Sequence, residues 1–311
     1  MADEKLKLMD LTKKVTKKED GERIDKVGII GAGIMGQGIA QTIAAKGVDV
    51  IVVEKDEPSL KNSIQNLTKS MENEIARWSL TKSELKGIMA KIKWSIRMED
   101  IKDCDLIIEA VEENIDVKVK IFKELEELAK PHTIFVSNTS TLSLTKIGEK
   151  IKRRDRFIGM HFIHPVPKIP IVELGKEVST SEKTVHRIKD FLKKIGKRPI
   201  EVYEYPGFIT TRVMMPMINE SIHILMEGLA DTKEIDCAIK LGFNFKMGPL
   251  EMADAMGLDD VLSWMKQLWN ALGEPQFRPC PLIRKLVREK KLGKKVGEGF
   301  YKYDAQGKII S

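Results

Sequence analysis

A glycine-rich loop between a short apolar run and a helical pattern places the strongest constraint on the fold of this chain. The apolar run 27–30 leads into Gly-Ala-Gly-Ile-Met-Gly at residues 31–36, and a helical pattern follows. Gly31 suits a tight turn, Gly33 lets the backbone approach a pyrophosphate, and Gly36 allows close packing of helix on strand. The unpaired N–H groups at the start of such a helix attract phosphate. The motif therefore predicts a strand–loop–helix unit that binds a dinucleotide.

The residue after the next apolar run indicates which dinucleotide is bound. Glu54 follows the run 50–53 and lies 18 residues after Gly36. A carboxylate here can accept hydrogen bonds from both ribose hydroxyls, and it repels a 2′-phosphate. We therefore expect NAD rather than NADP. The alternative interpretation is that the glycines only form a tight turn. The expected strand before the loop, the helix after it and the carboxylate of Glu54 disfavour this alternative. The predicted contacts are Gly31, Gly33, Ile34, Met35, Gly36 and Glu54.

Short apolar runs alternate with helical patterns from residue 26 to residue 203, which is typical of a parallel sheet with crossover helices. Their β-branched, unalternating character indicates strands covered on both faces. The segment 59–92 interrupts this rhythm with two expected helices, the second preceded by a possible capping box from Thr81 to Glu84. The expected strands are 27–30, 50–53, 106–110, 134–137, 157–161, 171–174 and 200–203.

The pattern changes after Pro206 and Gly207, where strands stop and helical periodicity takes over. The predicted fold class is therefore α/β: a Rossmann-like doubly wound sheet followed by an all-α C-terminal domain. Helices are expected at about 208–228, 231–242, 249–272 and 281–291. The expected division is an N-terminal extension at 1–23, a nucleotide-binding domain at 24–205 with the insert near 59–92, and a helical domain at 206–311.

Composition excludes several classes of protein. Lysine and arginine exceed the acids by 53 to 46, and the excess lies in a basic block between residues 278 and 302. Such a block attracts nucleic acid, a membrane surface or phosphorylated small molecules, or it is merely a solvated helix face. No apolar run approaches the roughly 18 residues of a membrane span, and residues 1–23 lack the apolar core of a secretory signal. We expect a cytoplasmic protein whose cysteines are unpaired: Cys104, Cys237 and Cys280.

Polar residues follow three of the expected strands, at the edge of the sheet where ligands of such folds bind. His161 suits a general base that takes a hydroxyl proton during hydride transfer, because histidine titrates near neutrality. A nearby carboxylate would orient its ring. A core histidine is the alternative interpretation, and a metal pair of His161 with His164 is disfavoured because residues i and i+3 of an extended chain point to opposite faces. We expect no metal. The strand ends are 109–114, 137–141 and 161–165, with Glu173 on the next strand.

Seven stretches of the chain resemble one known family, the (S)-3-hydroxyacyl-CoA dehydrogenases, in the short-chain form called 3-hydroxybutyryl-CoA dehydrogenase. The resemblance runs from about residue 26 to residue 303 and covers both expected domains. It implies NAD-dependent interconversion of a 3-hydroxyacyl-CoA and a 3-ketoacyl-CoA, in fatty acid or butyrate metabolism. The stretches are GAGIMGQGIA (31–40), DLIIEAVEENIDVKVKIF (105–122), SNTSTL (137–142), RFIGMHFIHPVP (156–167), PGFITTR (206–212), MGPLEMADAMGLD (247–259) and GKKVGEGFY (293–301).

The resemblance implies roles for residues at matching positions. His161 would be the base, Glu173 its partner, and Ser140 a hydrogen-bond donor to the substrate oxygen. The two-helix insert resembles an acyl-CoA-binding appendage, and the C-terminal helices resemble a dimerisation domain, so an acyl-CoA substrate and a homodimer are expected. Further implied cofactor contacts are Glu113, Lys118, Ser140, His164 and Lys295; further implied substrate contacts are Ser70, Arg77, Ser140 and Thr211.

Two positions depart from the family pattern. His164 stands where the family motif His-Phe-Phe-Asn-Pro has asparagine, and Thr211 replaces the asparagine of Pro-Gly-Phe-x-x-Asn-Arg. A threonine has a shorter reach and no amide, and losing one donor to a substrate oxygen typically costs about 10² to 10³ in rate. A relative that acts on a different 3-hydroxy acid or thioester is therefore a second hypothesis.

A third hypothesis is an NAD-binding protein that has lost its activity, and the presence of His161, Glu173 and Ser140 argues against it. Nucleic-acid binding would explain the basic block but neither the glycine loop nor the polar strand ends. Attraction of polyphosphorylated ligands accounts for the block equally well, so we expect neither a nucleic-acid nor a membrane partner.

Overall fold

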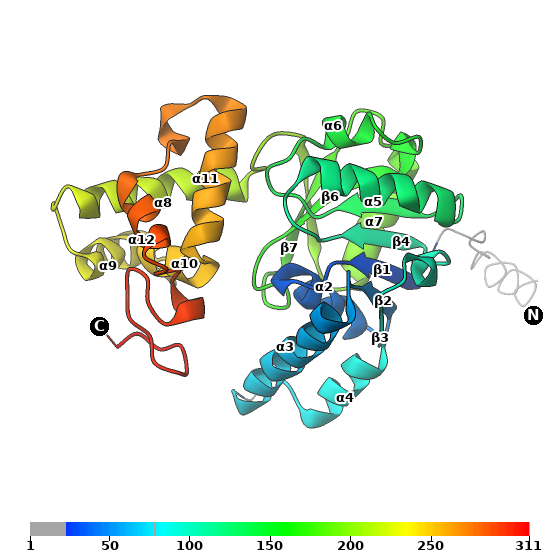
Figure 1. The fold of residues 1–311 in the computed structure, drawn as a ribbon, viewed down its shortest axis with the longest axis horizontal. Coiled ribbons are helices and arrows are strands. Elements are labelled where there is room, and N and C mark those ends of the chain that lie inside the picture. The colour runs from blue at the N-terminus through cyan, green and yellow to red at the C-terminus, as the bar shows by residue number, and fades with distance from the viewer. Residues whose placement is uncertain (1–22, 78, 311) are drawn as a thin grey trace, which may run out of the picture.

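The computed structural model describes residues 23–77 and 79–310 of the chain, so most of the expected N-terminal extension lies outside the described residues. An eight-stranded sheet in the order β3-β2-β1-β4-β5-β6-β7-β8 forms the centre of the first two thirds of the chain (Figure 1). Its strands are β1 (Lys26–Ile30), β2 (Asp49–Val53), β3 (Ile92–Ser95), β4 (Leu106–Glu109), β5 (Ile134–Ser137), β6 (Phe157–Phe162), β7 (Ile171–Lys176) and β8 (Arg198–Tyr203).

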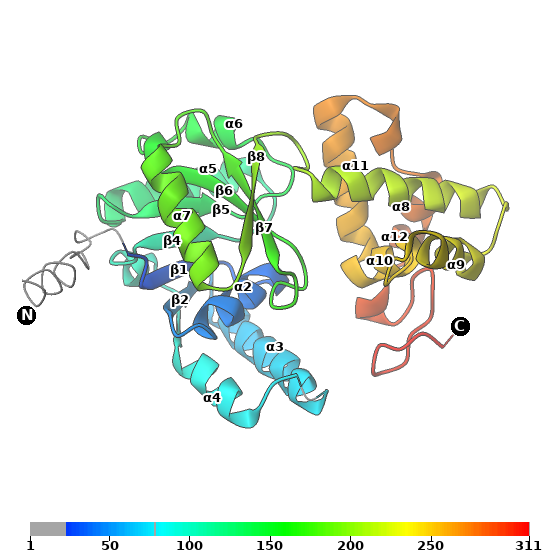
Figure 2. The same ribbon diagram turned by 180° about the vertical axis from the view of Figure 1, so that it is seen from behind.

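Helices cover both faces of the sheet, which explains why the inner strands are apolar without alternation. On one face, Phe122 and Leu144 join an apolar cluster with Ile107 and Phe135 of the sheet. The two helices that carry them are α5 (Ile115–Leu128), which lies in front of the strands in Figure 1, and α6 (Leu144–Gly148), near the top of that view. Figure 2 shows the opposite face, where α2 (Ile34–Ala44) and α7 (Glu182–Lys194) lie.

The insert consists of α3 (Glu57–Ala76) and α4 (Lys82–Ala90), and it projects from the β2 side of the sheet (Figures 1 and 2). The predicted capping box is confirmed, since the Thr81 hydroxyl accepts from the Glu84 N–H while the Glu84 carboxylate accepts from the Thr81 N–H. The chain returns to the sheet as β3, beside β2. The sequence prediction missed β3, because the exposed Lys93 interrupts its four residues.

Helices alone form the second part of the chain. They are α8 (Thr210–Met226), α9 (Thr232–Phe243), α10 (Pro249–Met256), α11 (Leu258–Leu272) and α12 (Pro281–Arg288). Met215 and Ile218 of α8 pack against Leu250 and Leu268 in their apolar core. The expected helix at 249–272 is broken at Gly257, whose φ of 100° lies outside the helical region. Short 3₁₀ helices complete the fold: Met98–Ile101, Arg154–Arg156, Pro275–Phe277 and Lys294–Val296.

The predicted fold class is confirmed, with one departure in the sheet. Each pair of neighbouring strands is parallel except β6 and β7, which are antiparallel. The parallel pairing typical of the sequence pattern is therefore interrupted at this pair. Only eight residues separate Phe162 from Ile171, which is too short for the crossover that a parallel pair needs. No helix among the described residues is both long and apolar enough to cross a membrane.

Candidate active site

The glycine loop is shaped by close backbone contacts. Gly31 has a φ of +87°, and a Cβ atom there would lie 2.8 Å from the carbonyl oxygen of Ala110. A Cβ atom on Gly36 would lie only 2.0 Å from the carbonyl oxygen of Gly31. Gly33 has nothing within 4 Å of its Cβ position, so the space above it is open to a ligand. These three environments fit the turn, packing and pyrophosphate roles predicted for the glycines.

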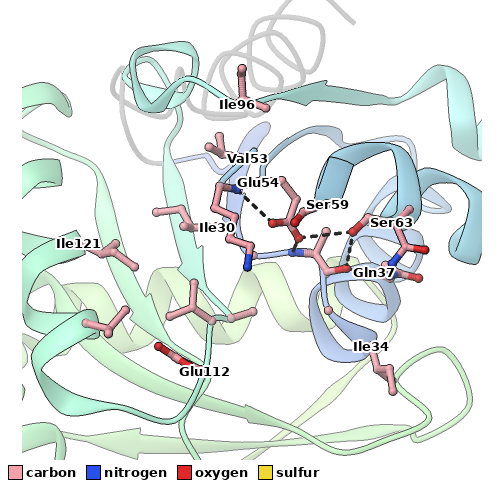
Figure 3. Close-up of a pocket in the computed structure, with 18 of the residues that line it drawn as sticks. Ile30, Ile34, Gln37, Val53, Glu54, Ser59, Ser63, Ile96, Glu112 and Ile121 are labelled. Carbon is pink, nitrogen blue, oxygen red and sulfur yellow. Dashed lines mark hydrogen bonds between the residues drawn. The ribbon is translucent and has the colours of Figure 1, made fainter. Parts of the chain in front are cut away.

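A cavity of about 750 Å³ opens at this loop (Figure 3). Of the predicted cofactor contacts, Gly31, Gly33, Ile34 and Glu54 line it, whereas Met35 and Gly36 do not. The α3 helix of the insert forms another wall, with Ser59, Asn62, Ser63 and Asn66. Sequence reasoning assigned the insert to the substrate alone and missed these wall residues, because their spacing resembles the polar face of any solvated helix.

Glu54 is fixed in the cavity by the loop itself. Its Oε1 accepts a hydrogen bond of 2.7 Å from the backbone N–H of Ala32, and its Oε2 accepts one of 3.1 Å from the N–H of Lys55. The buried Ser63 hydroxyl donates to the Ala32 carbonyl at 3.0 Å and ties α3 to the loop. Figure 3 shows Glu54, Ser63 and Gln37 gathered at this corner of the cavity. The carboxylate is therefore held at the wall of the cavity, which fits the predicted preference for NAD.

The antiparallel pairing of β6 with β7 brings a histidine and a carboxylate together. His161 lies directly opposite Glu173 in the register of this pair. The Nδ1 atom of His161 lies 2.7 Å from Oε2 of Glu173, and the two side chains are 11% and 1% exposed. A nearly buried carboxylate that accepts the Nδ1 proton leaves Nε2 free to accept another proton. The predicted partners are thus in contact.

The first turn of α8 surrounds this pair. The ring of Phe208, just before α8, stacks on the His161 ring with centroids 5.6 Å apart. Gly175 makes room for Phe208, because a Cβ atom there would lie 2.4 Å from that ring. Burial raises the pKa of Glu173, but the hydrogen bonds from His161 and Thr210 outweigh this and hold the pKa below its ordinary value. The carboxylate therefore stays charged beside the imidazole.

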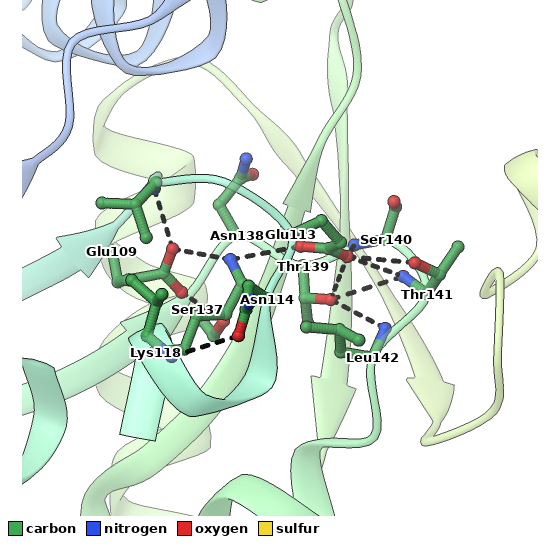
Figure 4. Close-up of polar contacts among 12 residues, drawn as sticks. Glu109, Glu113, Asn114, Lys118, Ser137, Asn138, Thr139, Ser140, Thr141 and Leu142 are labelled. Carbon is green, nitrogen blue, oxygen red and sulfur yellow. Dashed lines mark hydrogen bonds and ion pairs between the residues drawn. The ribbon is translucent and has the colours of Figure 1, made fainter. Parts of the chain in front are cut away.

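A second carboxylate organises the loop that carries Ser140 (Figure 4). Oε1 of Glu113 accepts from the Thr139 hydroxyl at 2.5 Å and from the backbone N–H groups of Ser140 and Thr141 at 3.0 and 3.1 Å. These bonds fix the backbone of the loop that follows β5. The Thr141 hydroxyl also contacts the Gln267 side chain of α11, which links this loop to the helical domain. Glu113 therefore holds Ser140 in place through the loop.

A fully buried ion pair lies beneath this loop (Figure 4). The ammonium of Lys118 is 2.6 Å from Oε1 of Glu109 and 3.1 Å from Oε2 of Glu113. Oε2 of Glu109 in turn accepts from the Ser137 hydroxyl at 2.7 Å. Burial lowers the pKa of Lys118, but the two carboxylates outweigh burial and hold that pKa above its ordinary value. The charged ammonium thus anchors Glu113.

Comparisons with known proteins match both halves of the chain. The family model described as "3-hydroxyacyl-CoA dehydrogenase, NAD binding domain" matches residues 26–205, and the one described as "3-hydroxyacyl-CoA dehydrogenase, C-terminal domain" matches residues 207–303. The chain belongs to the 3-hydroxyacyl-CoA dehydrogenase family. A "probable 3-hydroxybutyryl-CoA dehydrogenase" of Bacillus subtilis is 41% identical over 281 residues, which cover 90% of this chain and 98% of the relative.

Other members of the family are similar over the same length. The mitochondrial hydroxyacyl-coenzyme A dehydrogenase of Homo sapiens is 39% identical over 289 residues, which cover 90% of this chain and 91% of the relative. The crystal structure of (S)-3-hydroxybutyryl-CoA dehydrogenase from Ralstonia eutropha matches with a TM-score of 0.81 and 41% identity, over 90% of this chain and 99% of that one. The chain is accordingly an NAD-dependent oxidoreductase of 3-hydroxyacyl-CoA thioesters, and the predicted enzyme class and cofactor are confirmed.

Several predicted contacts of this dehydrogenase lie away from the glycine-loop cavity. Ser70 and His164 line a second cavity of about 260 Å³ between α2, α3 and the loop after β6. Arg77, at the exposed end of α3, lines neither of these two cavities. Lys295 belongs to the helical domain, where its ammonium pairs with Asp259 at 2.5 Å and Asp260 at 3.3 Å. Thr211 is buried on the first turn of α8.

Proposed function

We propose that this dehydrogenase oxidises short-chain 3-hydroxyacyl-CoA thioesters, such as 3-hydroxybutyryl-CoA, and reduces the corresponding 3-ketoacyl-CoA, with His161 as the base. The 2.7 Å contact between Nδ1 of His161 and Oε2 of Glu173 carries the proposal. With Nδ1–H donated to the carboxylate, Nε2 takes the proton from the substrate hydroxyl. Glu173 stabilises the imidazolium that results, and in the reverse direction the imidazolium returns the proton.

The chain's other residues bind and orient the reactants in this proposal. NAD, when bound, would accept the hydride from the carbon that carries the hydroxyl group. Ser140, 8% exposed, donates a hydrogen bond to the substrate oxygen, and Glu113 fixes the loop that presents it. The proposed cofactor contacts are Gly31, Gly33, Ile34, Met35, Gly36, Glu54, Glu113, Lys118, Ser140, His164 and Lys295; the proposed substrate contacts are Ser70, Arg77, Ser140 and Thr211.

A panel of 3-hydroxyacyl-CoA thioesters of increasing chain length tests the proposed substrate. We expect kcat/KM to be highest for the four-carbon thioester and lower for each longer chain. The Thr211→Asn variant, which restores the amide of the family pattern, should hold or raise turnover on the four-carbon thioester, because an amide reaches further toward a substrate oxygen than a hydroxyl does. Initial rates of NADH formation give both results.

The panel and the variant each have an outcome that would contradict the expectation. A preference for long-chain thioesters or for free 3-hydroxy acids would contradict the proposed short-chain CoA thioester substrate. A tenfold or greater fall in Thr211→Asn would instead show that the site is adapted to threonine. The Thr68→Asn variant, at a partly buried position on α3 where the hydroxyl bonds the Ile64 carbonyl, controls for the cost of placing an amide in a helix.

We further propose a homodimer formed through the helical domain, with the domain boundary between β8 and α8. Large apolar side chains are exposed on the α8–α9 hairpin: Leu229 is 77%, Leu241 is 81% and Phe243 is 71% exposed. Apolar surface of this kind on a soluble chain marks an interaction site.

Light scattering tests the dimer. We expect a mass of about twice the 35.3 kDa of one chain. Phe243→Asp should shift the protein toward monomer because it places a charge in the interface. Val178→Asp, at an exposed apolar position outside the hairpin, is the matched control and should leave the mass unchanged. A monomeric wild-type protein, or equal behaviour of both variants, would contradict the proposed interface.

We also propose a cytoplasmic location and a role in fatty acid or butyrate metabolism. Cys104, Cys237 and Cys280 are all free thiols, which fits a reducing compartment. Fractionation of the source cells with an antibody against the chain tests the location.

A further inference from the structure

The first turn of α8 reaches across the domain boundary to the carboxylate of the catalytic pair. Oε1 of Glu173 accepts from the backbone N–H groups of Ile209 and Thr210, at 3.1 and 2.9 Å. Oε2 accepts from the Thr210 hydroxyl at 2.8 Å. Any residue except proline at positions 209 and 210 supplies the two N–H bonds, whereas the third bond comes from the hydroxyl of the Thr210 side chain. The hydroxyl is thus a specific feature of this chain's sequence.

The Thr210 hydroxyl and the imidazole share one oxygen atom. Oε2 of Glu173 lies 2.7 Å from Nδ1 of His161 and 2.8 Å from Oγ1 of Thr210. A carboxylate oxygen that accepts a second hydrogen bond offers less negative charge to the first donor, because each bond to the charged form stabilises it. The hydroxyl therefore weakens the pull of Glu173 on the Nδ1 proton.

We propose that Thr210 is a positioning residue that sets the basicity of His161 by sharing Oε2 of Glu173. This inference rests on the proposed role of His161 as the base. The hydroxyl limits the stabilisation of the imidazolium, so the proton taken from the substrate is returned readily in the reverse reaction. Since Thr210 begins α8, the same bond ties the catalytic pair to the helical domain.

Few other groups around Glu173 and His161 could change the basicity of the imidazole. The α8 groups that face Glu173 are neutral N–H and hydroxyl donors, and the Phe208 ring that covers His161 is uncharged. On β8, the residue paired with Glu173 in the register is the apolar Ile200. The titratable side chain that contacts Glu173 is His161 itself.

The pH dependence of kcat/KM for oxidation tests the inference in the full-length enzyme. Thr210→Val removes the hydroxyl and keeps the shape of the side chain. The acid limb of the profile should move to higher pH by about half a unit, because the imidazolium gains the full charge of Oε2. Thr210→Ser should restore the wild-type profile, and Thr210→Ala should shift it as valine does. Thr232→Val, at the first residue of α9, is the matched control and should leave the profile unchanged.

The Nδ1 proton resonance of His161 gives a readout that does not depend on turnover. In ¹⁵N-histidine-labelled protein without substrate, the resonance lost in His161→Gln is assigned to this proton. We expect it further downfield in Thr210→Val, because the bond to Oε2 strengthens, and restored in Thr210→Ser. If the wild-type enzyme turned over no acyl-CoA, the proposed function would fail while this shift still decided the inference. An unchanged resonance, or a pH profile moved by less than about 0.1 unit, would overturn it.

Discussion

Replacing His161 by glutamine lowers kcat about 10³-fold, within the range that a general base contributes, while NADH still binds. Glutamine keeps a hydrogen-bonding side chain of similar length but cannot take up the hydroxyl proton. The cofactor should bind unchanged, because His161 does not line the glycine-loop cavity. Steady-state rates with acetoacetyl-CoA give kcat, and the fluorescence of bound NADH gives the dissociation constant.

The exposed histidine of α7 provides the control. His186→Gln should leave both quantities unchanged, since position 186 lies on the solvent side of α7, away from Glu173 and the cavity. A fall of less than tenfold in His161→Gln would contradict the assignment of His161 as the base. A large loss of NADH affinity would point instead to a role in holding the cofactor.

Replacing Lys118 by methionine lowers the free energy of unfolding by about 3–5 kcal/mol, the usual cost of leaving a buried charge without its partner. Lys118 and Glu109 are both completely buried and lie 2.6 Å apart. Methionine fills most of the space but leaves two carboxylates, Glu109 and Glu113, without a cation. Chemical denaturation monitored by circular dichroism measures the change.

Two further variants show whether the loss of stability comes from the buried charges or from a change in α5 itself. Lys120→Met lies on the exposed side of the same helix, α5, and should change the free energy of unfolding by less than about 0.5 kcal/mol. Lys118→Met combined with Glu109→Gln should recover part of the loss, because it removes one of the two stranded charges. Equal free energies of unfolding for Lys118→Met and Lys120→Met would contradict this prediction. The buried ion pair would then add no stability beneath the Ser140 loop.

The local structure around the glycine loop follows from residues that lie close together in the chain. The glycine loop and Glu54 belong to one strand–loop–helix–strand unit, in which each residue's role depends on neighbours close in the chain. The capping box of the insert is local in the same way, and the structure has it where the pattern indicated. Local structure of this kind can be predicted from the sequence alone.

The parts that depend on pairing between distant segments do not follow from local sequence patterns. The resemblance implied that Glu173 partners His161, but it took the antiparallel register of β6 and β7 to show why the two side chains meet. Thr210 drew no notice, because nothing in a Pro-Gly-Phe stretch indicates that the next helix begins against a buried carboxylate. The link from Lys118 to both Glu109 and Glu113 also depends on how α5 packs under the sheet edge.

Reduction of acetoacetyl-CoA by the wild-type protein, followed as the loss of NADH absorbance, tests the central claim most directly. The account predicts turnover with acetoacetyl-CoA and a kcat/KM at least about 10²-fold lower for free acetoacetate, which lacks the binding energy of the CoA moiety. No turnover of acetoacetyl-CoA, or an equal or higher kcat/KM for free acetoacetate, would contradict it.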